Sequence, residues 1–197
     1  MKIMKIACAL LMTAVISVSH AAVIHITDSS GKLLGANNVL VDGALYDVEF
    51  LDGTCTNLFN GCDEQSDFTF DTGPSVQLAL IALWELVLVD TQAGLFFTRP
   101  DLTRGCDISF CLLTTPYEFI NTPGLFQVKM LALASISDPS IPTFFSVDSD
   151  AELDTSILGE QVYARWTAHI EVNEPGTIIL LSFGMAGLFL SRHRKKS

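Results

Sequence analysis

Residues 39–50, with the sequence VLVDGALYDVEF, carry the strongest local signal for the fold. Two apolar runs flank Asp42 and Gly43, a pair that tolerates the positive φ angles of a tight hairpin turn. The second run alternates, so it should have a core face and a solvated face. The expected core face comprises Tyr46, Val48 and Phe50, and the solvated face Asp47 and Glu49. The stretch predicts a β-hairpin against a hydrophobic core.

Strands are expected on both sides of this hairpin. Alternating or β-rich runs occupy residues 22–27, 95–98, 106–113, 125–136 and 163–172. The last run alternates most clearly, which predicts a half-buried antiparallel strand that leads directly into the C-terminal tail. The turn-rich region between the hairpin and the central apolar segment is expected to be mostly loop.

One segment favours a helix. Residues 76–89 are apolar except for Gln77 and Glu85, and their leucines and alanines favour the helical state. Ser75 is the predicted N-cap. Since polar positions are so few, we expect this helix to be the central core element, nearly surrounded by the sheet. The predicted class is α+β or mainly β: one antiparallel-sheet domain with a single central apolar helix.

The N-terminus has the features of a secretory signal peptide. Lys2 and Lys5 precede an apolar run, and small residues end it before Ala21 and Ala22. We therefore expect residues 1–21 to be removed by signal peptidase, with Ala22 as the first mature residue. Residues 22–172 would form one exported domain, long enough to bury a core of its own.

Acidic residues dominate that domain. The whole chain has a net charge of −11, although basic residues are concentrated at its two ends. Nucleic acids and anionic lipid surfaces are poor partners for such a field, so no nucleic-acid partner is expected. Divalent cations, cationic polymers or solubility outside the cell suit it better.

The four cysteines of the domain fall in two local pairs, Cys55 with Cys62 and Cys106 with Cys111. Zinc is the competing use, but no histidine lies near either pair and export leads to an oxidising compartment. Two short-range disulfides are the prediction, and connectivities that cross between the pairs stay open.

The C-terminal 25 residues have three parts. A polar motif at 173–177 precedes an uncharged apolar segment at 178–190, and a basic tail occupies 191–197. As a helix the apolar segment would rise about 20 Å, short of a hydrocarbon core of about 30 Å. It is apolar around its whole circumference, however, and the flanking basic side chains can snorkel and favour the cytoplasm. A short transmembrane helix is expected, and the expected membrane-stop residues are Arg192, Arg194, Lys195 and Lys196.

This tail resembles the PEP-CTERM sorting signal of Gram-negative bacteria. The resemblance rests on Glu174 and Pro175, on a glycine-punctuated apolar segment and on the basic end, whereas Asn173 stands where the family usually has its first proline. Residues 42–55 are also similar to a segment common in uncharacterised proteins that bear such tails. The resemblance implies processing by an exosortase near residues 173–175, in organisms that make extracellular polysaccharide. Exosortase, signal peptidase and the inner membrane are therefore the expected partners, with exopolysaccharide as a further candidate.

Few residues are candidates for catalysis or metal binding. Asp47 and Glu49 could form a general acid/base pair, although such pairs are more often a solvated strand face. His25 and His169 lie in predicted strands beside no catalytic motif, which favours structural roles. Four alternating acids resemble a calcium loop but fail the EF-hand pattern. They are Asp148, Asp150, Glu152 and Asp154.

Three classes of function follow. The leading hypothesis is an exported, non-enzymatic surface or matrix protein that is anchored transiently in the inner membrane and then released by tail processing. The alternative is a secreted carbohydrate- or calcium-binding module, with Trp166 and the acidic run as its candidate groups. The weakest is a hydrolase that uses paired carboxylates such as Asp47 and Glu49. No cofactor is expected.

Overall fold

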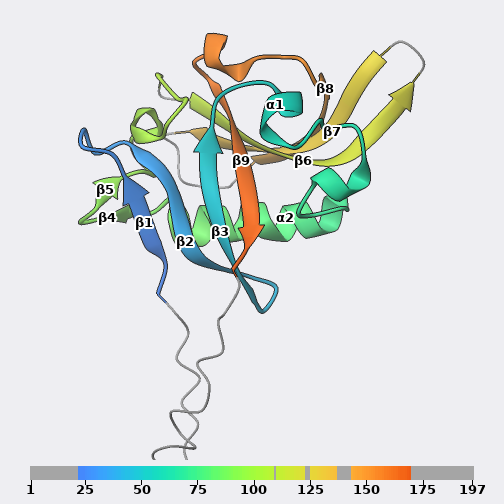
Figure 1. Cartoon of the computed structure of the whole chain (residues 1–197). Helices are drawn as coiled ribbons and strands as arrows, with labels where there is room; N and C mark the ends of the chain where they lie inside the picture. Colours follow the sequence, from blue (N-terminus) through green and yellow to red (C-terminus); the bar gives the residue numbers. More distant parts are fainter. Residues whose placement is uncertain (1–21, 109, 123–124, 137–142, 170–197) are drawn as a thin grey trace, which may run out of the picture.

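A seven-stranded sheet forms the frame of the domain (Figure 1). The computed structural model describes residues 22–108, 110–122, 125–136 and 143–169. Across the sheet the strands follow the order β1, β2, β3, β9, β6, β7, β8. Their bounds are β1 Ile24–Thr27, β2 Leu33–Val41, β3 Ala44–Leu51, β6 Phe110–Thr122, β7 Leu125–Ile136, β8 Thr143–Asp150 and β9 Gln161–Ala168. Strands β6, β7 and β8 run across the direction of the other four in Figure 1.

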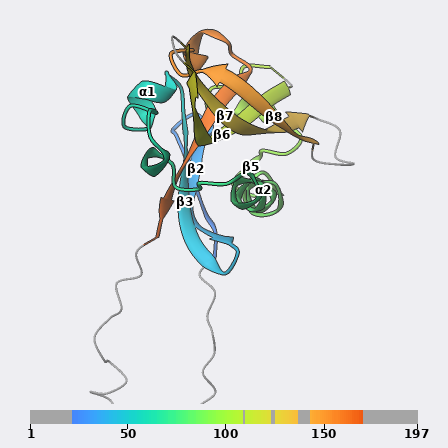
Figure 2. The same ribbon diagram turned by 90° about the vertical axis from the view of Figure 1, so that its right-hand side faces the viewer.

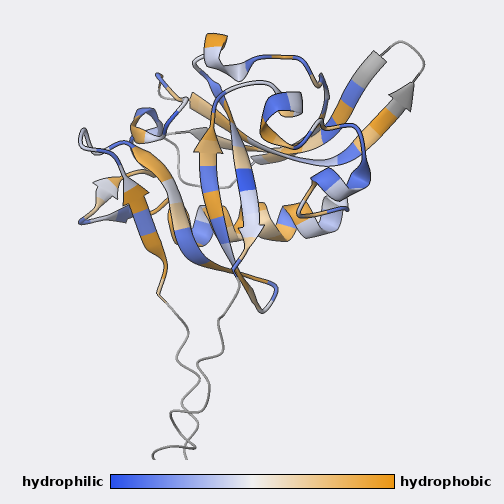
Figure 3. Ribbon diagram, in the orientation of Figure 1, coloured by the Kyte–Doolittle hydropathy of each residue, from blue (hydrophilic) through white to orange (hydrophobic). Residues whose placement is uncertain are grey.

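The predicted hairpin is confirmed as β2 and β3. Asp42 and Gly43 form its turn with φ angles of 47° and 83°. Along β3, Val48 and Phe50 are fully buried while Glu49 is exposed, and Figure 3 shows the corresponding alternation of apolar and polar residues. A bulge in β2 places Asn38 at φ 61°, and its backbone N–H donates to Asp47 Oδ1 at 3.0 Å.

The sheet is mixed rather than wholly antiparallel, which corrects the sequence-based expectation. Strand β9 pairs antiparallel with β3 but parallel with β6, through three residue pairs. It is therefore an interior strand, and its alternation does not mark one solvated face. Trp166 is buried on one side, whereas Tyr163 is buried on the other among a second set of apolar residues.

The predicted helix is present, but two of its details are wrong. Helix α2, Gly73–Ala82, continues as the single π turn η2, Leu83–Val87. Its N-cap is Thr72, whose side chain accepts from the backbone N–H of Ser75. The helix begins earlier than predicted because Pro74 is compatible with a first helical turn and leaves Ser75 to complete the capping box.

Nor is the helix surrounded by the sheet. It lies along one face (Figure 2), burying Val76, Leu80 and Leu83, whereas Leu78 is 43% and Leu86 36% exposed. Apolar residues are common on the exposed side of a helix, because much of any protein surface is apolar. The composition of the segment therefore overstated its burial.

The two faces of the sheet carry separate cores. Helix α2 covers the larger core, which includes the Cys106–Cys111 pair. The short helix α1, Cys55–Leu58, and the 3₁₀ turn η1, Gln65–Asp67, lie over the smaller core on the opposite face (Figure 2). Within the smaller core, Phe59 packs edge-on against Tyr163 at 5.6 Å between ring centroids.

Both predicted cysteine pairs are at disulfide distance. The Cα atoms of Cys55 and Cys62 are 5.7 Å apart, and those of Cys106 and Cys111 are 5.6 Å apart. All four side chains are buried. The short-range pairing is thus confirmed.

Several strand boundaries differ from the expectations. Strand β7 has the predicted bounds, but β6 begins at Phe110 and runs to Thr122, because a bulge next to Pro116 lets the strand continue beyond it. Strand β8 was missed, since its polar C-terminal half resembles a loop. Of the predicted strand at 95–98, only Leu95 is extended, in the two-stranded ribbon of β4, Asp90–Thr91, and β5, Gly94–Leu95.

The two described ends of the chain lie at the same end of the sheet. Strand β1 starts there and β9 finishes there, beside the β2–β3 turn (Figure 1). The predicted signal peptide, 1–21, and the predicted sorting tail, 173–197, lie outside the described residues. Among the residues described, no helix is long and apolar enough to cross a membrane.

Candidate functional site

The predicted acid pair on β3 is engaged in structural contacts. Asp47 accepts from the bulged strand, and its Oδ2 atom lies 3.2 Å from His169 Nδ1. Glu49 forms an ion pair with Arg165 of the neighbouring strand. Both carboxylates thus link β3 to its neighbours β2 and β9. These contacts explain the presence of the two acids on β3 without a catalytic role.

The two histidines of the domain have different surroundings. His25 Nε2 lies 2.8 Å from the backbone oxygen of Val87, and its ring stacks on Phe96. His25 therefore fastens the end of the π turn to strand β1. His169 follows β9, where its backbone N–H donates to Leu45 and its ring contacts Asp47. Each histidine contributes to the packing of an element end.

Trp166 does not offer a surface to a sugar. Its side chain is 3% exposed, packs edge-on against Phe70, and lies with Nε1 3.3 Å from Thr115 Oγ1. Trp166 lies on β9, an interior strand between β3 and β6. Trp166 is therefore a core residue, and the prediction that it binds carbohydrate is wrong.

The four acids proposed for calcium are spread over a strand end and two turns. Asp148 and Asp150 lie in β8, and Asp150 Oδ1 accepts from the backbone N–H of Glu152. Asp154 caps the turn η4, Thr155–Ile157, and its hydrogen bonds to Ser156 lower the pKa of its carboxyl. Asp150 and Asp154 thus cap local turns, and calcium binding by the four acids stays a prediction.

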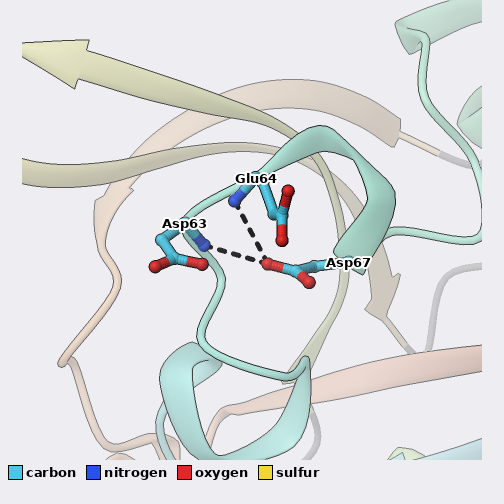
Figure 4. A group of neighbouring side chains, drawn as sticks. All are labelled: Asp63, Glu64 and Asp67. Carbon is cyan, nitrogen blue, oxygen red and sulfur yellow. Dashed lines mark hydrogen bonds between the residues drawn. The ribbon is translucent and has the colours of Figure 1, made fainter.

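A different trio of acids does converge. Among the residues described, Asp63, Glu64 and Asp67 are the one group with three ligand atoms within 4.8 Å of one another (Figure 4). Asp67 Oδ2 accepts from the backbone N–H groups of Asp63 and Glu64, and Oδ1 accepts from Asn60. Partial burial opposes ionisation of Asp67, but these hydrogen bonds outweigh it and lower its pKa. The trio shapes the loop that follows Cys62.

Asp52 is a partly buried acid, one of whose carboxylate oxygens lacks a hydrogen bond within the described part of the chain. Its Oδ1 atom is buried and has no hydrogen-bond partner among the described residues. Burial raises the pKa of its carboxyl, against the attraction of Arg104. Asp107 and Asp154 add repulsion from nearby. This arrangement costs stability, but it provides neither a nucleophile nor a proton acceptor beside a cavity.

A surface pocket lies where the helix ends. A pocket of about 320 Å³ opens between the π turn η2 and the β4–β5 ribbon. Its lining is apolar and aromatic with two acids: Trp84, Glu85, Leu88, Val89, Asp90 and Phe97. The volume falls at the lower end of the range for small-molecule sites, about 300 to 1,000 Å³.

Three contacts define the pocket walls. The N–H of Leu88 donates to the oxygen of Leu83 at 2.8 Å, the bond that closes the π turn around Trp84. Asp90 Oδ1 accepts from the N–H groups of Phe97 and Thr98, at 2.9 and 3.1 Å. The Trp84 and Phe97 rings then meet edge to face with centroids 4.9 Å apart. π turns are frequent at functional sites.

No protein-family model matches the chain, and no curated protein or solved structure matches it either.

Sequence reasoning missed this pocket. Trp84 and Glu85 lie inside the apolar run predicted as a buried helix, and Phe97 lies in a segment predicted as a strand. The available signal was the adjacency of a tryptophan and an acid near the helix end. The predicted processing residues Ala21, Asn173, Glu174 and Pro175 and the basic tail lie outside the described residues. Ala22 is described, and its oxygen lies 3.4 Å from Asn38 Nδ2.

Proposed function

We propose that this chain is an exported surface or matrix protein, not itself an enzyme, that an exosortase releases from the inner membrane by cutting near residues 173–175. The observation that carries the proposal is the sequence of the tail. A polar motif, an apolar segment and a basic end follow a domain that is preceded by a signal-peptide pattern.

Two features of the domain support this proposal. Two local disulfides suit an oxidising compartment outside the cytoplasm. The described part of β9 ends at the same end of the sheet as the start of β1, so both predicted processing sites adjoin one end of the domain along the chain. Only residues 170–172 separate His169 from the proposed recognition motif.

The sequence of the motif also suits a protease. Pro175 restricts its own φ angle and disfavours the helical state for Glu174, so we expect an extended peptide here. The positive-inside bias opposes passage of the basic tail, which would hold the motif just outside the membrane until it is cut.

Mass analysis of the mature protein from its native host tests the proposal. The surface form should begin at Ala22 and end near residue 173, and Glu174→Ala with Pro175→Ala should retain the full-length tail in the inner membrane. Glu171→Ala is the matched control, since it removes an acid just outside the motif and should be processed normally. Release of the double variant with the wild-type C-terminus would refute the sorting role.

A further inference from the structure

The pocket at the end of the helix has a chemistry that selects one class of ligand. Aromatic rings carry negative charge on their faces and attract cations that lie within about 6 Å of the ring centroid. Trp84 and Phe97 both line the opening and pack edge to face, a contact that covers one face of one ring, and Glu85 and Asp90 add two carboxylates at the same opening. Among the described residues that line it, none is basic.

We propose that this pocket binds an organic ammonium group. The aromatic and aliphatic wall contacts the carbon substituents of the cation, and the carboxylates offset its charge. Anionic ligands are disfavoured by both acids and by the net charge of −11 of the chain. A bare metal ion is a poor match, because Trp84, Leu88, Val89 and Phe97 offer it no oxygen ligand from their side chains.

The pocket is also built to hold its shape. Asp90 uses Oδ1 to fix the backbone of Phe97, while the π turn presents Trp84 and Glu85 side by side along the chain. His25 fastens Val87 to strand β1 from the far side of the turn. A pre-formed pocket loses less conformational entropy on binding than one that must be ordered by its ligand.

If the chain is exported as proposed above, two sources outside the cell supply this chemistry. One is an amino-sugar polymer, whose protonated amines would make the pocket a contact to extracellular polysaccharide. The other is the choline headgroup of a lipid. Both present an ammonium with carbon substituents, so the first experiment tests the shared group and the second separates the sources.

Intrinsic fluorescence gives a direct readout, because the chain has two tryptophans and Trp166 is 3% exposed. Choline is titrated into the full chain in a non-ionic detergent at low salt, beside its neutral isostere 3,3-dimethyl-1-butanol. Choline should change the emission of Trp84 with saturation and bind at least about tenfold more tightly than the isostere, and added salt should weaken it. Equal binding of the two, or no saturable change, would overturn the proposal.

Variants locate the binding. Glu85→Gln with Asp90→Asn keeps the shape and the backbone contacts of Asp90, and should weaken choline binding about tenfold without changing the affinity for the isostere. Glu152→Gln removes an exposed acid elsewhere and should leave the affinity unchanged. A matching loss in Glu152→Gln would assign the effect to overall charge and refute a site at the pocket.

The source arms use glucosamine oligosaccharides and soluble glycerophosphocholine, which carries the lipid headgroup without the acyl chains. Binding that is lost in the double variant with the oligosaccharide alone assigns the pocket to polysaccharide, and the same result with glycerophosphocholine alone assigns it to a lipid headgroup. These measurements require no tail processing, so they can fail or succeed independently of the sorting role. Binding of neither, together with failure of the choline titration, would remove the ammonium site.

Discussion

Single residues of the sheet show how closely the strands approach one another. Gly35 in β2 lies opposite Glu49 and next to the bulge, and a Cβ atom there would collide with the backbone oxygen of Val48. Backbone atoms cannot move aside as the end of a flexible side chain can. The sequence marks this position only as a glycine inside a run of apolar and polar residues.

Gly35→Ala should therefore lower the free energy of unfolding by about 3 kcal/mol or more, since the collision forces β2 away from β3. Gly43→Ala is the matched control: its φ is 83°, but nothing lies within 4 Å of the added Cβ, so it should cost about 1 kcal/mol. Denaturant unfolding followed by circular dichroism measures both. Equal losses would show that the close approach of the strands is not what requires Gly35.

The partial burial of Asp52 predicts the sign of one pH dependence of stability. Burial raises the pKa of its carboxyl above the ordinary 3.8, so the folded state binds the proton more tightly than the unfolded state. The destabilising effect of its charge is absent below pH 3.8, grows as the pH rises through the folded pKa, and is complete above it.

Asp52→Asn should increase the free energy of unfolding at pH 7, by less than about 1 kcal/mol because the carboxyl is only partly buried and solvent screens it. This gain in the free energy of unfolding should vanish below pH 3.8, where the carboxyl is protonated in both states. Unfolding curves at several pH values measure it, with Asp71→Asn, an exposed acid, as the control that should show no comparable trend. A gain that increases toward low pH would contradict the direction of the shift.

At the level of secondary structure, the N-cap of helix α2 lies about one turn before the N-cap that the sequence pattern predicts. Thr72 and Ser75 exchange hydrogen bonds in a capping box, and both are residues that favour an N-cap. Apolar periodicity identifies where the core-facing residues begin, whereas the cap lies one turn earlier.

Thr72→Ala should cost about 1 kcal/mol of unfolding free energy, because the N–H of Ser75 loses its partner. Ser75→Ala should cost no more than about 0.5 kcal/mol, since it removes only the return half of the box and places alanine inside the helix. Denaturant titration of the two single variants measures the difference. The opposite order of losses would restore Ser75 as the N-cap.

At the scale of the whole molecule, the two disulfides serve different cores. The Cys55–Cys62 bond closes the loop over the smaller core, while Cys106–Cys111 lies in the larger core beside Leu113 and Val162. On the loop-entropy account each contributes roughly 2 to 2.5 kcal/mol. Loss of each bond should nonetheless destabilise a different region of the domain.

Replacing Cys55 and Cys62 by alanine should reduce hydrogen-exchange protection mainly around α1 and η1, on the smaller core, because that region can open locally. Replacing Cys106 and Cys111 by alanine should instead lower protection across the strands that meet in the larger core. Hydrogen exchange read by peptide mass measures both double variants. Uniform loss in both would show that the two cores unfold as one cooperative unit.

The features that could be predicted from the sequence are those that depend on neighbours along the chain. Alternation predicted the hairpin at residues 39–50 and β7, and short separations predicted both disulfides, because such contacts form within one turn or one loop. Tertiary structure alone decided what depends on distant segments. Insertion of β9 between β3 and β6 buried Trp166, and packing of α2 on one face left Trp84 at a pocket with Phe97. Periodicity records that a side chain is apolar, but which surface covers it is set by strands far apart in the chain.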